Sequence, residues 1–280
     1  MFQLIIDNGQ LIIMIILENI TKRFVDGTRA LTVLDSLSLQ VDEAEFIAIV
    51  GESGAGKSTL LNILGTLVTA DDGRYIIRGE EASPTTSNRG GLTERICHLR
   101  NKEIGFVYQD HRLLPQFTVW QNILLPTLAT KSASTEEEER KAMKLLEFMG
   151  IAALKDSSVT QLSGGEQTRV TICRALINQP SILLADEPTG QLDAVNAQTI
   201  AKLFQQVNTQ LHTTIIMATH SAEMAKVAQK TYRLIKGKLM DDLTNKYDIS
   251  TAHSTKSKAL PTVLPVGQFC CHSDDGSTDG

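Results

Sequence analysis

The fold follows from one stretch of the chain, Phe46-Ile47-Ala48-Ile49-Val50-Gly51-Glu52-Ser53-Gly54-Ala55-Gly56-Lys57-Ser58-Thr59. It opens with a short apolar run, which is typical of a strand buried on both faces of a sheet. A loop punctuated by glycines comes next, and residues 60–64 then show helical spacing. This order of strand, loop and helix is the context in which the spacing G-x-x-x-x-G-K-S/T binds nucleotide phosphates. The stretch therefore predicts a nucleotide-binding loop in an α/β protein.

The residue types in this loop suit phosphate binding. Glycines let successive backbone N–H groups converge on phosphate oxygens, and the following helix adds the positive end of its dipole. Lys57 can reach the β- and γ-phosphates, and the Ser58 hydroxyl can bind Mg²⁺. The alternative is a chance glycine-rich turn, which average composition makes roughly a one-in-a-hundred match in such a chain. The residues expected around the phosphates are Gly51, Glu52, Ser53, Gly54, Ala55, Gly56, Lys57, Ser58 and Thr59.

Length and composition limit the class of protein. The 280 residues suffice for one large α/β domain, and the net charge of -5 gives no electrostatic case for a nucleic-acid partner. Cys97, Cys173, Cys270 and Cys271 lack zinc-ligand or CxxC spacing, which favours a reduced, cytosolic chain. The most apolar run, residues 11–17, is far shorter than the roughly 20 residues of a membrane span. Any contact with a membrane is therefore expected through a partner.

The sequence divides into a central folded part and two ends. Residues 14–245 are expected to form the nucleotide-binding domain. We expect Met14 to be the natural start, because it opens a good first strand, and residues 1–13 to be an extension with little function. Residues 246–280 are polar and lack periodicity, which predicts a disordered tail.

Short runs near the nucleotide-binding loop predict a small antiparallel sheet. Residues 14–20, 32–35, 37–41 and 73–79 have the alternation or the glycine boundaries of strands. Residues 82–95 are rich in serine, threonine, glycine and proline, which predicts a surface loop or an insertion.

Further apolar runs at residues 104–108, 182–186 and 214–219 predict additional strands of the central sheet. A helix between the last two would make a crossover, and strand, helix and strand in this order predict parallel pairing with a right-handed connection. The apolar stripe of that helix is Ile200, Leu203, Phe204, Val207 and Leu211.

Residues from about 110 to 165 predict a helical subdomain inserted between strands. Residues 134–137 fit a capping box, in which a hydroxyl and a carboxylate cap the first turn reciprocally. Met143, Leu146 and Met149 would form the buried face of the helix that follows.

The second candidate site is the acidic pair at the end of a predicted strand. Asp186 and Glu187 follow an apolar run, at the edge of an α/β sheet where ligands bind. Asp186 suits Mg²⁺, directly or through water, and Glu187 is expected to polarise the attacking water. The alternative is a solvated strand end, which the upstream phosphate loop makes the weaker interpretation.

The third candidate is Ser163-Gly164-Gly165-Glu166, here called the serine-glycine turn, which leads into a helix. Such a turn can bind an anion with the helix dipole behind it, although alone it could equally be an ordinary helix cap. The chain thus has two phosphate-binding helix starts but only one complete phosphate loop.

The order of these motifs resembles that of ATP-binding-cassette (ABC) ATPases over roughly residues 17–243. The resemblance rests on residues 51–58, Gln109, residues 162–167, the pair Asp186-Glu187, and His220. It implies a RecA-like P-loop NTPase core with a small antiparallel β subdomain and an inserted helical subdomain. It also implies ATP and Mg²⁺ as cofactors.

The resemblance implies a homodimer. In the family, Ser163, Gly164, Gly165 and Glu166 would face the γ-phosphate held by the other subunit's phosphate loop, and two cassettes close head-to-tail over two ATP molecules. Residues 190–193 stand where the family has its dimer-contact loop. Turnover would then wait for a second chain.

The resemblance also implies roles for isolated residues. Gln109 is similar to the glutamine that senses Mg²⁺ and communicates with the membrane partner. His220 is similar to the histidine that contacts the γ-phosphate, and Lys57, Glu187 and His220 would be the catalytic set. Phe24 stands where the family usually has an adenine-stacking tyrosine. Without the resemblance, a lone histidine at a strand end would more often be structural.

Finer similarity points to the lipoprotein-release and macrolide-export branch, through residues 100–109, 113–123 and 185–193. Thr168 replaces a commoner glutamine or arginine, and Cys173 replaces a usual alanine. The implied function is the ATPase subunit of a transporter, peripheral at the cytoplasmic face of the inner membrane, with transmembrane permease subunits as partners. The alternatives are a cassette that transmits force in cell division, a soluble cassette acting on DNA or ribosomes, and a phosphate-loop kinase or small-molecule transferase.

Overall fold

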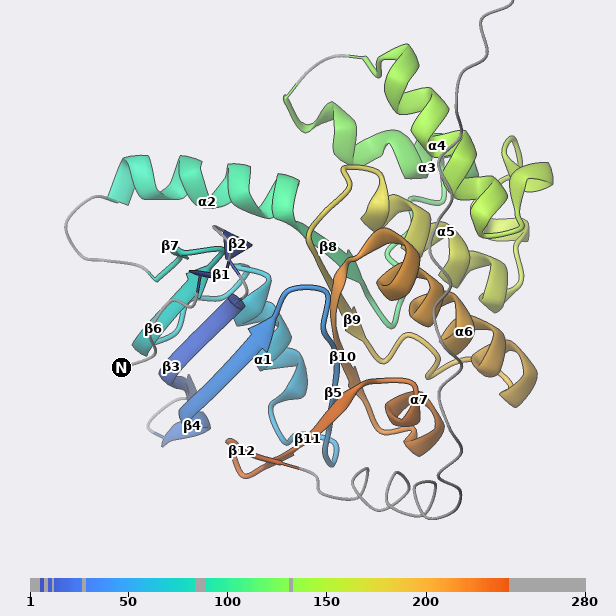
Figure 1. The fold of residues 1–280 in the computed structure, drawn as a ribbon. Helices are drawn as coiled ribbons and strands as arrows, with labels where there is room; N and C mark the ends of the chain where they lie inside the picture. The colour runs from blue at the N-terminus through green and yellow to red at the C-terminus, as the bar shows by residue number, and fades with distance from the viewer. Residues whose placement is uncertain are drawn as a thin grey trace, which may run out of the picture. The chain divides into compact units, whose positions relative to one another are not determined.

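The computed structural model describes residues 6–7, 10–11, 13–26, 29–83, 89–130 and 133–241 (Figure 1). The predictions for the tail at 246–280 therefore lie outside the described residues. The prediction of an α/β fold with a parallel core sheet, an antiparallel sheet and a helical insertion is confirmed.

The central sheet has the strand order β12-β11-β5-β10-β9-β8. Its pairs are parallel except for the hairpin between β11 and β12. The nucleotide-binding loop follows β5, which has a parallel neighbour on each side. The strands are β5 (Phe46–Val50), β8 (Ile104–Val107), β9 (Ile182–Asp186), β10 (Thr214–Thr219), β11 (Lys230–Ile235) and β12 (Lys238–Asp241).

Strand β5 is apolar throughout because each face of the sheet has its own core. Phe46 and Ala48 belong to the core that includes Phe204, whereas Ile47 and Ile49 belong to the core that includes Leu60. Alternate side chains along a strand point to opposite faces, so a strand covered on both sides needs no polar position. The helices that contribute to these cores include α1 (Lys57–Leu64), α5 (Gly164–Leu176), α6 (Ala194–Leu211) and α7 (Ala222–Lys226).

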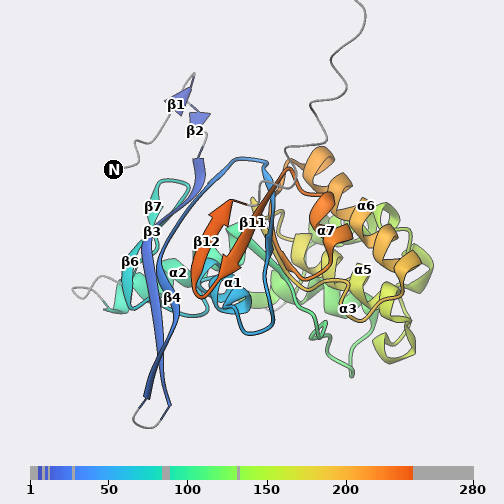
Figure 2. The ribbon, with the colours of Figure 1, turned by 90° about the horizontal axis from the view of Figure 1, so that it is seen from below.

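A four-stranded antiparallel sheet has the order β4-β3-β6-β7. Figure 2 shows β3 and β4 side by side as a long hairpin. The prediction of two strands at 32–35 and 37–41 is wrong, because a single strand runs through both. Its pairing register shifts between Leu37 and Leu34, and Ser36 has a φ of 50°, so a bulge takes the place of a break. The strands are β3 (Ile13–Asp26), β4 (Arg29–Asp42), β6 (Asp72–Ile77) and β7 (Glu80–Glu81), and β1 (Ile6–Asp7) pairs with β2 (Gln10–Leu11).

The prediction of a surface loop over 82–95 is wrong from Arg89 onward, where helix α2 (Arg89–Glu103) begins. This helix has few apolar residues, so its periodic signal in the sequence is weak. An exposed ion pair, Arg95 to Glu80 at 2.7 Å, links it to β7.

Short helices fill the predicted insertion between β8 and α5. The predicted capping box is wrong by one residue: Thr135 and Glu138 cap α4 reciprocally. Leu146 and Met149 are buried as predicted, but Met143 is 37% exposed, and Leu211 of the crossover helix is 46% exposed. Leu211 is the last residue of α6, so it lies where the buried face of that helix ends. The elements are α3 (Val119–Leu124), η1 (Leu125–Thr130), α4 (Glu136–Phe148), η2 (Ala152–Leu154) and η3 (Val159–Gln161).

Candidate functional site

The nucleotide-binding loop joins β5 to α1 in a backbone shape that only small residues permit. Gly56 precedes the helix with a φ of 105°, and a Cβ there would lie 3.0 Å from the Val33 carbonyl oxygen. A Cβ at Gly51 would lie 2.7 Å from the Leu234 carbonyl oxygen. The two glycines that begin and end the loop are therefore required by close backbone contacts.

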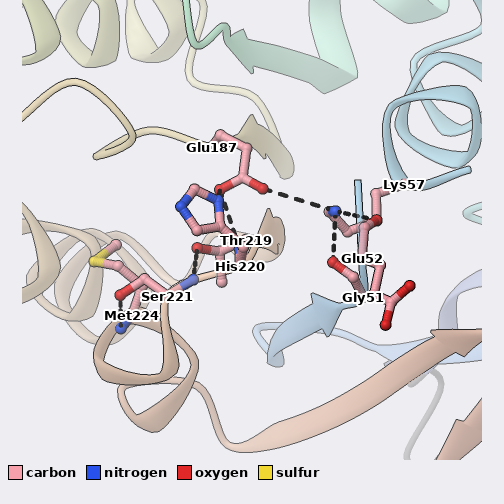
Figure 3. Close-up of polar contacts among 8 residues, drawn as sticks. All are labelled: Gly51, Glu52, Lys57, Glu187, Thr219, His220, Ser221 and Met224. Carbon is pink, nitrogen blue, oxygen red and sulfur yellow. Dashed lines mark hydrogen bonds and ion pairs between the residues drawn. The ribbon is translucent and has the colours of Figure 1, made fainter. Parts of the chain in front are cut away.

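Lys57 lies in the first turn of α1 and is buried. Its Nζ donates hydrogen bonds to the carbonyl oxygens of Gly51 at 2.8 Å and Glu52 at 3.1 Å, and it lies 3.8 Å from Glu187 Oε1 (Figure 3). The ammonium group is thus held inside the curve of the loop, where it can neutralise phosphate charge.

Asp186 ends strand β9 beside the start of α1. The Ser58 side chain hydrogen-bonds to this carboxylate, while Asp186 Oδ1 is buried without a hydrogen-bond partner among the described residues. Burial raises the pKa of Asp186, the Ser58 hydrogen bond lowers it, and the charge of Glu187 raises it further. A hydroxyl and an unpartnered carboxylate oxygen are hard oxygen donors, so this pair fits Mg²⁺.

Glu187 follows directly, with a φ of 46°, which is uncommon for a residue with a side chain. Its backbone N–H donates to the Ala218 carbonyl oxygen at 2.9 Å. Its Oε2 accepts from the backbone N–H of His220 at 3.1 Å and lies 2.8 Å from His220 Nδ1 (Figure 3). The ends of two neighbouring parallel strands, β9 and β10, therefore bring the carboxylate and the imidazole together.

Lys57, Ser58, Glu187 and His220 line one cleft of about 800 Å³, and Asp186 is not among its lining residues. The structure brings Gln109, Glu187 and His220 together with the loop, and Phe24 lies at the cleft, 43% exposed. Leu31 and Val33 also line the cleft and were not predicted from the sequence, and the pairing of β3 with β4 places Leu31 opposite Phe24. The lining residues are Phe24, Leu31, Val33, Gly51, Glu52, Ser53, Gly54, Gly56, Lys57, Ser58, Thr59, Gln109, Glu187 and His220.

The serine-glycine turn lies outside this cleft and starts α5. Glu166 Oε2 accepts hydrogen bonds from the Ser163 backbone N–H at 2.8 Å and from its hydroxyl at 2.7 Å. Both hydrogen bonds lower the pKa of Glu166, and the bond from the hydroxyl has the larger effect. A Cβ on Gly165 would lie 3.1 Å from Asn196 Oδ1, so α6 closes one side of the turn. Ser163 and Gly164 are exposed, and the start of a well-capped helix is presented outward.

Among the helices that the structure describes, none combines the length and the apolar character needed to cross a bilayer.

Comparison with known proteins identifies relatives along most of the chain. Residues 34–190, more than half of the sequence, match the family model described as "ABC transporter". The lipoprotein-releasing system ATP-binding protein LolD of Saccharophagus degradans is 41% identical over 221 residues, which cover 79% of this chain and 94% of that protein. The macrolide export ATP-binding/permease protein MacB of Rhodopirellula baltica is 38% identical over 258 residues, 91% of this chain and 37% of that protein.

A solved structure has the same fold. The dimeric structure of MJ0796, a bacterial ABC transporter cassette, superimposes with a TM-score of 0.72 at 32% identity and covers 81% of this chain and 98% of that one. A second dimeric structure of MJ0796 is of a post-hydrolysis state bound to ADP and Pi. The chain therefore belongs to the ABC transporter family, as an ATP-binding subunit that hydrolyses ATP.

Proposed function

We propose that this chain hydrolyses ATP between two head-to-tail copies of itself and so drives a transmembrane permease. The observation that carries the proposal is the separation of two phosphate-facing helix starts. One, at Lys57, lies in the nucleotide cleft, whereas the other, at Ser163, lies outside it with its N-terminus exposed. A second copy would supply the missing turn.

In this proposal the cleft holds ATP from end to end. The adenine stacks on Phe24, with Leu31 and Val33 giving it an apolar surround. The phosphates lie against the backbone of the nucleotide-binding loop, and Lys57 turns its ammonium toward them. Loop and side chain together bind three phosphates by backbone N–H groups, the helix dipole and one fixed positive charge.

Ser58, Asp186 and Gln109 would hold Mg²⁺. The unpartnered Oδ1 of Asp186 and the adjacent Ser58 hydroxyl support this assignment. Mg²⁺ bound there would neutralise charge that develops on the phosphate oxygens.

Glu187 is positioned to take a proton from the attacking water. As the water oxygen bonds to the γ-phosphorus, the bond from that phosphorus to the bridging oxygen breaks, and ADP and phosphate leave. His220 holds Oε2 of Glu187, and Oε1 lies 3.8 Å from Lys57 Nζ, on the side of the nucleotide-binding loop.

The test of the dimer is Glu187→Gln. The amide keeps the shape of the carboxylate but accepts no proton, so the variant is expected to accumulate as a dimer in saturating MgATP by size-exclusion chromatography with light scattering. Addition of Lys57→Ala to Glu187→Gln should return it to a monomer. A chain with Glu187→Gln that stays monomeric in saturating MgATP would contradict the proposal.

We further propose the cytoplasmic face of the inner membrane as the site of action and lipoprotein release as the transport process. The similarity to LolD proteins supports this proposal. In three of them the match covers 94% to 100% of the relative's length. Purification from membranes of the source organism should recover a permease with the chain. A permease whose ATPase stimulation depends on a macrolide would favour export instead, and recovery of ribosomes or DNA would overturn both.

A further inference from the structure

A buried histidine lies in the segment that follows Gln109, here called the Gln109 loop (residues 109–112). His111 is 8% exposed and has a φ of 57°, so its backbone is in the left-handed region. Histidine adopts that region more readily than most residues with a side chain. The unusual backbone turns the imidazole inward, toward α5.

The imidazole contacts a buried threonine of α5. His111 Nε2 lies 2.9 Å from Thr168 Oγ1, and Thr168 is fully buried. Thr168 Oγ1 also donates to the carbonyl oxygen of Gly164 at 3.0 Å. Because a hydroxyl has one hydrogen and a carbonyl oxygen can only accept, the imidazole must be the donor to Thr168.

The contact therefore forms a directed chain of two hydrogen bonds. It runs from the Gln109 loop, through the Thr168 hydroxyl, to the main chain of the serine-glycine turn at Gly164. A threonine in a helix often bonds to the carbonyl four residues earlier, so the second bond alone would be unremarkable structure. The first bond, across 57 positions of sequence, is what ties the two functional segments together.

Arg174, farther along α5, binds the backbone of the Gln109 loop. Its guanidinium donates to the carbonyl oxygens of Arg112 at 2.6 Å and His111 at 2.7 Å. Arg112 in turn stacks on the ring of Tyr108, 3.8 Å from its centroid. Side chains of α5 thus hold the loop at two points, of which only the Thr168 contact continues to the serine-glycine turn.

We propose that His111 and Thr168 are positioning residues that make the Gln109 loop and the serine-glycine turn move as one unit. The inference rests on the proposed dimer, in which the turn of one chain closes on the nucleotide of the other. When MgATP sets the position of Gln109, the hydrogen-bonded chain sets that of Gly164. Loss of these two hydrogen bonds should weaken closure of the dimer and leave nucleotide binding within one subunit unaffected.

The experiment compares Thr168→Val with Thr168→Ser in the full chain. Valine keeps the volume of threonine but has no hydroxyl, so His111 loses its buried acceptor, whereas serine keeps the hydroxyl. His111→Asn is the second variant, since asparagine tolerates the left-handed backbone but is too short to reach Thr168. Thermal unfolding of all variants identifies any general loss of stability.

Two readouts separate positioning from packing. The affinity of monomeric chain for the fluorescent analogue trinitrophenyl-ATP should change by less than about twofold, while kcat for ATP falls about tenfold in Thr168→Val and in His111→Asn, as for loss of one buried hydrogen bond. Thr168→Ser should keep most of the activity. The double variant with Thr168→Val and His111→Asn should have a kcat no lower than that of the less active single variant, because both substitutions remove the same contact.

Dimer formation in the Glu187→Gln background distinguishes the two proposals. Dimerisation of Glu187→Gln that is reduced by Thr168→Val and retained with Thr168→Ser supports the inference. Equal dimerisation of Glu187→Gln alone, with Thr168→Val and with Thr168→Ser would overturn the inference and leave the dimer proposal standing. An equal loss of dimer with Thr168→Val and with Thr168→Ser would also overturn the inference, because it would show that Thr168 acts through packing and not through its hydroxyl. Failure of Glu187→Gln itself to dimerise would overturn both.

Discussion

At the scale of single residues, Lys57 both shapes the nucleotide-binding loop and supplies a positive charge to the cleft. Its ammonium holds the curve of the loop through Gly51 and Glu52 and presents a positive charge 3.8 Å from Glu187. A charge so placed in a cleft acts more strongly than an exposed one, because the surrounding protein screens it less.

Lys57→Ala is expected to lower ATP hydrolysis at least about 100-fold, because both the charge and the hydrogen bonds that shape the loop are lost. Phosphate release at saturating MgATP measures the effect. Lys226→Ala, in α7 and outside the cleft lining, is the matched control and should retain activity. Retained turnover in Lys57→Ala would remove the residue from the catalytic set.

Residue identities were predictable where a motif has fixed spacing, and not where the chain folds back on itself. The loop residues, Glu187 and His220 were named from sequence, and the structure places them in one cleft. Leu31 and the contact of His111 with Thr168 were missed. Neither has a local signal, because each depends on which distant segment packs against it.

At the scale of elements, the start of α4 shows how finely a cap is determined. Both Ser134 and Thr135 have a hydroxyl, but Thr135 makes the reciprocal bonds with Glu138, while Ser134, among the described residues, bonds to the side chain of Glu139 at 3.1 Å. A capping hydroxyl satisfies a backbone N–H that the first helical turn leaves free.

Thr135→Ala should therefore destabilise the chain by about 1 kcal/mol. Ser134→Ala removes a hydroxyl that caps no backbone group and should cost less than about 0.5 kcal/mol. Urea unfolding followed by circular dichroism compares the two. A larger effect at Ser134 would restore the cap position expected from the sequence.

The end of α2 depends on a carboxylate. Glu103 Oε2 accepts hydrogen bonds from Ser181 Oγ at 2.6 Å and from Arg78 at 3.0 Å, which join α2 to the segment before β9 and to the residue after β6. Burial acts to raise the pKa of Glu103, but the hydrogen bonds from Ser181 and Arg78 outweigh it, and the pKa lies below its ordinary value.

This lowered pKa predicts a pH dependence. A carboxyl whose folded pKa is below its unfolded value stabilises the fold above the unfolded pKa of 4.5, and that stabilisation is lost as pH falls through the folded pKa. Glu103→Gln should cost about 1 kcal/mol at pH 7, given its partial exposure, and nearly nothing once wild type is protonated. Glu80→Gln, which removes an exposed pair with Arg95, should cost less at pH 7. A Glu103→Gln deficit independent of pH would contradict the electrostatic origin.

Elements were predictable in proportion to their burial. The core strands have continuous apolar runs because two cores cover them, and their positions were found to within a residue or two. Helix α2 was missed because it packs few apolar side chains, and strand β4 was predicted as two strands because a bulge at Ser36 interrupts its alternation.

At the scale of the whole molecule, the proposed dimer, in which two chains share each site, predicts complementation between two inactive chains. Gly165→Asp crowds Asn196 and places a carboxylate in the serine-glycine turn, where it would repel phosphate, but leaves the nucleotide-binding loop intact. Lys57→Ala has the opposite defect. A mixed dimer of the two contains one intact composite site.

If the two variants pair at random, half of the dimers are mixed and each mixed dimer has one good site of two, so an equal mixture should recover about a quarter of wild-type turnover. Each variant alone, at the same total concentration, is the control and should be nearly inactive. Phosphate release after mixing in MgATP measures the recovery. An inactive mixture would show that the two defects do not complement across a dimer.

The place of β5 in the sheet has a consequence for local opening. The strand pairs with β10 and β11 and contributes side chains to both cores, so its amides cannot reach water without disrupting the whole sheet. We expect the amide protons of Ile47 and Ile49 to exchange with deuterium only through global unfolding, and those near Val25 and Leu31, which are 75% and 64% exposed, to exchange by fraying. The phosphate-binding end of the cleft is then attached to β5, the last part of the described structure to open. The adenine end is attached to the β3–β4 hairpin, one of the first parts to open.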